Sequence, residues 1–93
     1  MADELTSPRG QYLLRFFDSK MKNADKVEKY RKDDFDITVA FTRESMGYKS
    51  GYKPVPTMYV KLEKDNLIEI KRFTGKNIDK YIKKIREISE RVY

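Results

Sequence analysis

Residues 55–82 decide the fold, and they read VPTMYVKLEKDNLIEIKRFTGKNIDKYI. Apolar residues occupy every second position from 58 to 62, which is the period of a strand with one buried face. A turn-prone run over 63–66 separates this strand from a second one over 67–73, so the two strands are expected to form a hairpin. Gly75 then ends the hairpin, and a helix is expected to follow.

The last part of the chain predicts an amphipathic helix. Its apolar residues recur at spacings of three and four, and Asn77 is a candidate N-cap. These apolar residues are Ile78, Tyr81, Ile82, Ile85, Ile88 and Val92. Charged residues of both signs fill the other positions, and Lys83 and Glu87 have the spacing of a helical ion pair. Such mixed charge is typical of a solvated face.

The first half of the chain predicts a strand, a helix and a second strand. Residues 11–18 form a short apolar run with three aromatic side chains, typical of a buried strand, although so short a run also fits a helix. From 21 to 32, apolar residues recur every three positions, which indicates a helix with a narrow apolar face. Alternation from 35 to 41 then predicts a strand.

These elements follow one another in the order β-α-β-β-β-α, after a polar tail over residues 1–10. A strand–helix–strand crossover makes the first two strands parallel, whereas the turn at 63–66 makes the last pair antiparallel. We therefore expect the α/β class, with a single domain over residues 11–93 built on a mixed four-stranded sheet flanked by helices.

The composition excludes most catalytic chemistry. The 93 residues include no cysteine and no histidine, so thiolate nucleophiles, disulfides and the common ligands of transition metals are absent. Asp33, Asp34 and Asp36 lack the glycine turn and the further oxygen ligands of a calcium loop. We therefore expect a protein that is not an enzyme and that binds no cofactor and no metal.

Charge and hydropathy bear on partners and location. The net charge of +6 favours acidic partners such as nucleic acid, an anionic membrane surface or an acidic protein, and it also fits a basic surface that only confers solubility. No apolar run approaches the roughly 18–20 residues that cross a bilayer, and the acidic N-terminus is not a secretory signal. We expect an intracellular protein without membrane insertion, cytoplasmic by default, with a mitochondrial location as the alternative.

Val55, Pro56 and Thr57, followed by the hairpin, Gly75 and the last helix, resemble the second half of thioredoxins, glutaredoxins and the thioredoxin domains of disulfide isomerases. In that family a proline in the cis form opens the third strand, and the backbone edge beside it docks extended polypeptide. The resemblance covers about residues 11–90. It implies a thioredoxin-like fold of glutaredoxin size, with Pro56 in the cis form.

The resemblance does not extend to the redox motif. If residues 13–17 are the central strand of the family, Met21 and Ala24 occupy the two positions of its Cys-x-x-Cys pair. A thioether and a methyl group cannot carry out thiol–disulfide exchange. Met21 and Ala24 are therefore interpreted as core or rim residues, and the protein is expected to be redox-inactive.

The run Ser-Pro-Arg-Gly over 7–10, followed by Leu-Arg-Phe-Phe over 14–17, is similar to the opening of a redox-inactive thioredoxin-fold family. That family contains mitochondrial ribosomal proteins and a small accessory subunit of respiratory complex I. In its register residues 11–20 form a helix, and the strand that would precede them is missing. The two resemblances therefore predict different structures, a strand or a helix, for residues 12–17.

The long polar connection over 42–54 is the main candidate for a binding surface. It interleaves cations with tyrosines and glycines, which suits either protein docking or stacking on nucleic-acid bases, and it also fits a solvated loop. Together with the proline-led strand, it gives the candidate partner-binding residues Arg43, Tyr48, Lys49, Tyr52, Lys53, Val55, Pro56 and Thr57.

These features predict a non-catalytic binding or structural subunit of a larger assembly, which contacts other protein subunits. The alternative is a basic, RNA-contacting subunit of the ribosomal type. A third hypothesis is a cysteine-free, glutaredoxin-like protein that binds a thiol cofactor such as glutathione.

Overall fold

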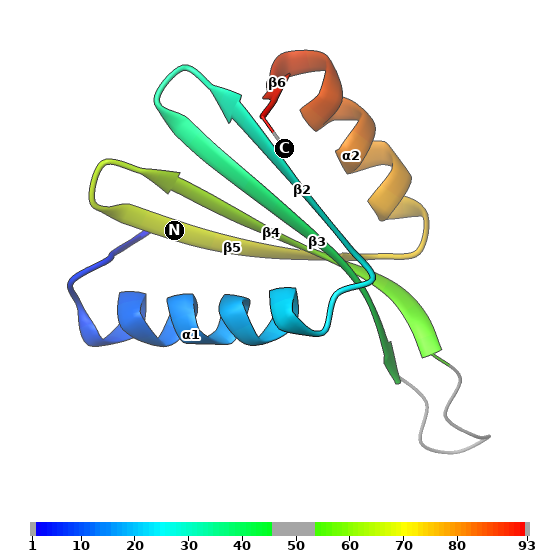
Figure 1. Ribbon diagram of the computed structural model, residues 1–93, viewed down its shortest axis with the longest axis horizontal. Helices are drawn as coiled ribbons and strands as arrows, with labels where there is room; N and C mark the ends of the chain where they lie inside the picture. The colour runs from blue at the N-terminus through cyan, green and yellow to red at the C-terminus, as the bar shows by residue number, and fades with distance from the viewer. Residues whose placement is uncertain (1, 46–53, 93) are drawn as a thin grey trace.

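An antiparallel meander of four strands forms the centre of the computed structural model, which describes residues 2–45 and 54–92. The strands of the meander are β2 (Lys26–Lys32), β3 (Phe35–Ser45), β4 (Pro54–Lys64) and β5 (Leu67–Thr74). Two-residue strands lie at its edges: β1 (Asp3–Glu4) pairs with β5, and β6 (Glu90–Arg91) pairs with β2. The order across the sheet is β1-β5-β4-β3-β2-β6 (Figure 1).

Two helices, α1 (Pro8–Lys22) and α2 (Lys76–Ile88), pack on opposite faces of the sheet. Side chains alternate between the faces along each strand, so Val39 and its neighbour Ala40 point to different sides. Val39 belongs to the core cluster that includes Ile85 of α2, whereas Ala40 packs with Phe17 of α1. Figure 1 shows the two helices on either side of the fan of strands.

Helix α1 begins where the sequence supplies both a cap and a proline. The Oγ atom of Ser7 accepts a hydrogen bond from the backbone N–H of Gly10 at 3.0 Å, and Pro8 occupies the first helical turn. Gly10 is required because of a close approach: a Cβ atom there would lie 1.9 Å from the carbonyl oxygen of Glu4. The N-terminal strand can therefore fold back tightly beneath the helix.

Both short hairpins of the meander turn at aspartate. Asp33 and Asp65 adopt positive φ angles of 53° and 52°, a conformation that aspartate tolerates better than most residues. Each lies in a two-residue connection, 33–34 between β2 and β3 and 65–66 between β4 and β5. Such connections match the right-handed twist of the strands. Asp33 thus belongs to a hairpin turn and not to the end of a helix.

The expected thioredoxin-like fold with a mixed four-stranded sheet is wrong. Every pair of neighbouring strands is antiparallel, whereas the expected β-α-β crossover requires a parallel pair. Residues 11–18 lie within α1, and the expected helix over 21–32 covers only the end of α1 and then β2. The hairpin over 58–73, the strand over 35–41 and the last helix are confirmed, although that helix ends at Ile88.

The error at β2 arises from a buried charge. Val27 and Tyr30 are three residues apart, a spacing that predicts one helical face. Val27 lies opposite Ala40 and Tyr30 opposite Ile37, however, so they face different sides of the sheet. The true period-two partner of Tyr30 is Glu28, which is fully buried. A glutamate at an inward position hides the strand pattern, because buried strand positions are normally apolar.

Two further expectations differ from the structure near the chain start and at Pro56. Residues 1–10, expected as a polar tail, contribute β1 and the first residues of α1. The peptide bond between Val55 and Pro56 is trans, since the described residues contain no cis peptide bond. Pro56 lies within β4, opposite Arg43 of β3. It has no partner in β5, because the pairing of β4 with β5 ends at Thr57, opposite Thr74. Neither helix of the described ranges is long and apolar enough to cross a membrane.

Candidate functional site

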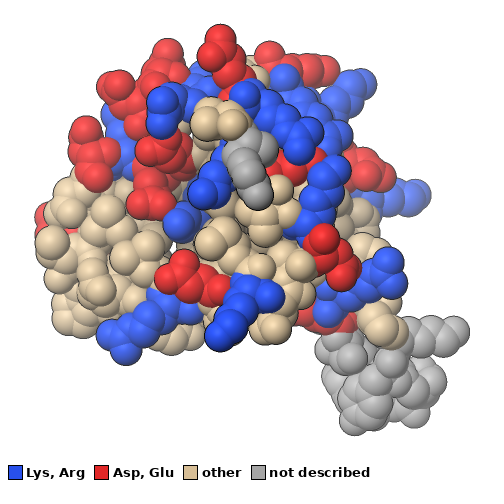
Figure 2. All heavy atoms as spheres, viewed as in Figure 1, with Lys and Arg blue, Asp and Glu red and all other residues tan. Residues whose placement is uncertain are grey.

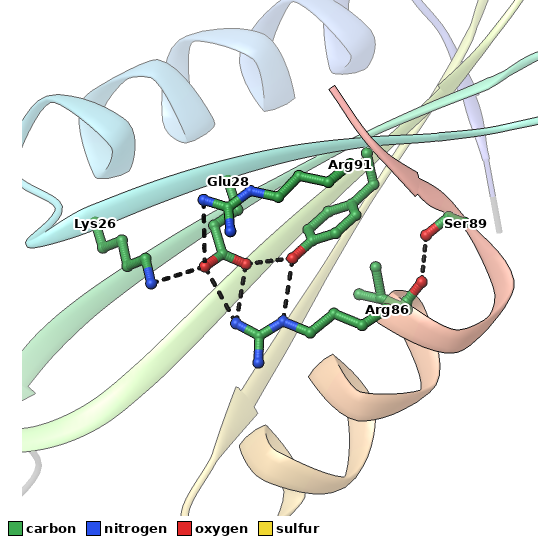
Figure 3. A network of polar contacts seen from close by, with 7 residues as sticks. Lys26, Glu28, Arg86, Ser89 and Arg91 are labelled. Carbon is green, nitrogen blue, oxygen red and sulfur yellow. Dashed lines mark hydrogen bonds and ion pairs between the residues drawn. The ribbon is translucent and has the colours of Figure 1, made fainter. Parts of the chain in front are cut away.

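Glu28 lies at the centre of a buried polar cluster (Figure 3). Its side chain has no exposed surface. The hydroxyl of Tyr30 donates a hydrogen bond to Oε1, and Nη2 of Arg86 lies 3.1 Å from both carboxylate oxygens. Lys26 Nζ and Arg91 Nη2 lie 2.9 Å and 3.9 Å from Oε2. The carboxylate therefore joins β2, α2 and β6.

The cluster fixes the protonation of Glu28. Burial raises the pKa of Glu28, but hydrogen bonds from Tyr30, Lys26 and Arg86 outweigh it and hold that pKa at about 2. Arg86 is stabilised in turn, because its hydrogen bonds to Tyr30 and Glu28 raise its pKa. An ionised, fully paired and inaccessible carboxylate has no proton to donate and reaches no substrate, so we assign this cluster a structural role.

A second ionic cluster surrounds Glu44 on the opposite face. Its carboxylate accepts hydrogen bonds from Lys20 Nζ at 2.6 Å and from the Tyr59 hydroxyl at 2.8 and 2.9 Å, with Arg72 Nη2 at 3.7 Å. Burial raises the pKa of Glu44, yet the hydrogen bonds from Lys20 and Tyr59 lower it overall. This cluster connects α1 with β3, β4 and β5. Both of its carboxylate oxygens are paired, so we assign this cluster a structural role as well.

The candidate residues around the β3–β4 hairpin are only partly described. Arg43 pairs with Pro56 in the sheet register, and Val55 and Thr57 lie opposite the residues on either side of Arg43, so the structure brings these four together. Arg43, Val55 and Pro56 lie in a two-stranded ribbon beyond the ends of β2 and β5, whereas Thr57 still pairs with Thr74 of β5. The other four candidates, Tyr48, Lys49, Tyr52 and Lys53, lie outside the described residues.

Met21 and Ala24, the positions compared with a redox pair, lie at the end of α1 and just after it. Both are partly buried and pack against the cluster formed by Phe17, Ala40 and Tyr59. Over the described ranges, no group of three or more acidic side chains is placed to hold a metal ion.

The most distinctive surface feature is a groove between α2 and the sheet. It has a volume of about 200 Å³. Its lining is apolar apart from two lysines, and we call it the α2 groove. The groove is lined by Lys32, Phe35, Ile37, Leu62, Tyr81, Lys84, Ile85 and Ile88. Two of the apolar side chains are well exposed, Phe35 at 37% and Ile88 at 49%.

The groove continues along α2 toward the end of β5. Tyr81 and Lys84 also line the adjoining hollow, together with Lys80 and Phe73. Lys76, Lys80 and Lys84 follow one another at four-residue spacing and therefore form one stripe along α2. Among the described residues, none of these three lysines has a carboxylate partner within ion-pair distance.

Figure 2 shows basic side chains gathered over the part of the molecule where α2 and β6 lie, with acidic ones among them. The groove itself is bordered by cations. Lys64 Nζ lies 5.0 Å from the ring centre of Phe35, and Lys71 Nζ lies 5.9 Å from that of Tyr81. An apolar floor with a lysine rim is suited to a ligand that is itself both apolar and anionic.

Sequence patterns did not identify the α2 groove. Their patterns predict ordinary apolar faces of a strand and a helix for Phe35 and Ile88, whereas in the structure both stay exposed at the groove. One signal was present: the stripe of Lys76, Lys80 and Lys84 carries like charges at helical spacing, an arrangement that costs helix stability unless an anion lies beside it.

Comparisons with protein-family models, with curated proteins and with solved structures find no match to this chain. Its function is therefore inferred from the geometry of its own residues.

Proposed function

We propose that this chain is a non-catalytic binding protein, a structural or adaptor subunit that holds its partner in the α2 groove. The observation that carries the proposal is the exposure of Phe35 and Ile88 beside lysines that have no carboxylate partner among the described residues. Apolar side chains gathered in a concave surface are typical of recognition sites. The buried carboxylate of Glu28 and the half-buried carboxylate of Glu44 are both committed to internal ion pairs, which also favours binding over catalysis.

Capture from native extract tests this proposal. We expect the double variant Phe35→Ala/Ile88→Ala to capture about one tenth or less of the protein that the wild type captures, because both changes remove apolar contact area from the groove. Capture is measured by quantitative mass spectrometry at physiological salt. Circular dichroism establishes that each variant is folded before the comparison is made.

Tyr12→Ala is the matched control. Tyr12 is an aromatic residue that is 60% exposed and lies on α1, away from the groove and on the opposite face of the sheet. This variant should capture the same proteins as the wild type. Equal capture by the groove variant and the wild type would contradict the proposal.

RNA is the second candidate partner. It is supported by the net charge of +6 and by the stripe of Lys76, Lys80 and Lys84. Binding of this kind depends on the release of counterions from phosphates, so affinity would fall steeply as salt rises. Ribonuclease treatment of the captured material separates this partner from a protein.

A further inference from the structure

Helix α2 covers only part of its face of the sheet. Four strands at the usual spacing are about 19 Å wide, whereas a helix with its side chains is about 10–12 Å across. The helix runs from Phe73 of β5 to Tyr30 of β2, since Tyr81 stacks on Phe73 and Arg86 bonds to Tyr30. The turn ends of β4 and β5 therefore lie beside α2 and not beneath it.

The residues at this uncovered corner follow from the strand register. Leu62 pairs with Glu69, and Lys64 pairs with Leu67, so all four side chains point to the α2 face. Leu67 is 43% exposed, and Leu62 is partly buried at the edge of the core. The corner thus extends the apolar floor of the α2 groove, with Glu69 as its single acidic side chain among those register positions.

The opposite face of the sheet provides an internal comparison. There α1 covers β3, β4 and β5, and a hollow next to it is lined mainly by polar and charged side chains, including Lys29, Arg31, Thr38, Lys61 and Glu63. Water can satisfy the polar groups of such a surface. On the α2 face, by contrast, the uncovered part includes the exposed apolar side chains Phe35, Leu67 and Ile88, which gain from contact with another apolar surface.

The charged side chains around the corner restrict which kind of partner can bind there. Lys32, Lys64, Lys71, Lys80 and Lys84 surround the apolar floor, and within the described ranges none of them forms an ion pair. A second copy of this chain, docked face to face, would bring these lysines against each other. The turns next to Lys32 and Lys64 carry Asp33, Asp34 and Asp65, but the lining of the groove itself contains lysines and no acidic side chain, so an acidic and apolar occupant fits it better than a second copy does.

The aromatic rings in the groove disfavour nucleic acid. Single strands bind by stacking bases on exposed ring faces. Here Tyr81 is stacked on Phe73 with ring centres 4.1 Å apart, and Lys71 lies over the ring of Tyr81. Lys64 lies over the ring of Phe35. The remaining apolar contacts are aliphatic, from Leu62, Leu67, Ile85 and Ile88, and these suit leucine and isoleucine side chains better than bases.

We propose that the α2 groove and its corner bind an amphipathic helix of an acidic partner protein, which lies beside α2 on β4 and β5. Its apolar residues, at i, i+3, i+4 and i+7, contact Leu62, Leu67 and Ile88, and its flanking carboxylates pair with Lys64 and Lys84. This is recognition of a helix in a groove. The inference rests on the proposed binding function and names the class of partner.

Designed peptides test the inference directly. The probe is a fluorescein-labelled peptide of about 15 residues, with leucines at i, i+3, i+4 and i+7 and glutamates beside them; its control has the same composition in scrambled order. Fluorescence anisotropy with the full chain should show at least tenfold tighter binding of the patterned peptide. Amide chemical shifts should move at Leu62, Leu67 and Ile88.

A charge exchange controls for misfolding. The variant Lys64→Glu/Lys84→Glu should bind the glutamate peptide at least tenfold more weakly, and it should gain affinity for a peptide with lysines in place of the glutamates. Equal binding of patterned and scrambled peptides overturns the inference, and so does displacement of the patterned peptide by oligouridine. If peptides fail while capture from extract still depends on Phe35 and Ile88, the partner class is wrong and the binding function stands.

Discussion

Replacing Glu28 by glutamine is expected to lower the free energy of unfolding by about 3 kcal/mol at pH 7. The pKa of Glu28 falls from 4.5 to about 2 in the folded chain, and each pKa unit corresponds to about 1.4 kcal/mol. Glutamine keeps the shape of the side chain but loses the charge that Arg86 and Lys26 neutralise. Urea unfolding followed by circular dichroism measures the difference.

The pH dependence gives this prediction its sharpest test. Because folding lowers the pKa of Glu28, its stabilising contribution is complete above the unfolded value of 4.5 and is lost as the pH falls toward about 2. The difference between wild type and Glu28→Gln should therefore shrink from about 3 kcal/mol at pH 7 to nearly zero near pH 2. A difference that stays constant over this range would contradict the assignment.

Glu87→Gln is the control for this experiment. Glu87 lies on α2, next to Arg86, and is exposed to solvent. Its replacement should change the free energy of unfolding by less than about 0.5 kcal/mol at either pH. The comparison separates the buried cluster from the general effect of removing one negative charge from a basic chain.

Replacing Phe17 by alanine is expected to cost about 3–5 kcal/mol of unfolding free energy. Phe17 has no exposed surface and is the large apolar side chain that α1 buries completely. It packs with Ala40 and Tyr59 on the sheet, and Lys61 Nζ lies 5.1 Å from its ring centre. Its removal leaves a cavity between helix and sheet that these neighbours fill only in part.

The matched control is again Tyr12→Ala, which removes an aromatic ring from the same helix at an exposed position. Its cost should stay below about 1 kcal/mol. Urea titrations at pH 7 measure both variants. Similar losses for Phe17→Ala and Tyr12→Ala would show that α1 contributes to stability mainly through its own helix and not through packing on the sheet.

Local pattern alone predicted the elements whose fully buried positions are mainly apolar. The hairpin over 58–73 and the helix that begins near Ile78 satisfy this condition, and both appear in the structure. For residues 11–18 the pattern allows a strand or a helix and the expected fold uses the strand, although Ser7 and Pro8 carry the signature of a helix start. The short apolar run after Ser7 and Pro8 fits either element, whereas the cap and the proline favour a helix.

The candidate site depended on information that periodicity does not contain. That Glu28 is an inward-facing strand residue follows only when Arg86, 58 residues later, provides its partner. The groove depends on the angle at which α2 crosses the sheet, which tertiary contacts such as those of Tyr81 with Phe73 determine. Neither the Glu28–Arg86 ion pair nor the Tyr81–Phe73 contact can be inferred from the pattern of residues that are close in the sequence.

The two short strands at the edges of the sheet have a consequence for how partners approach. β1 pairs with the start of β5, and β6 pairs near the end of β2. Both carry only charged side chains: Asp3, Glu4, Glu90 and Arg91. Short charged strands at an edge hinder the addition of a foreign strand. Recognition by strand addition is therefore discouraged where β1 and β6 pair, at the start of β5 and near the end of β2, and the helix-binding mode proposed above needs neither edge.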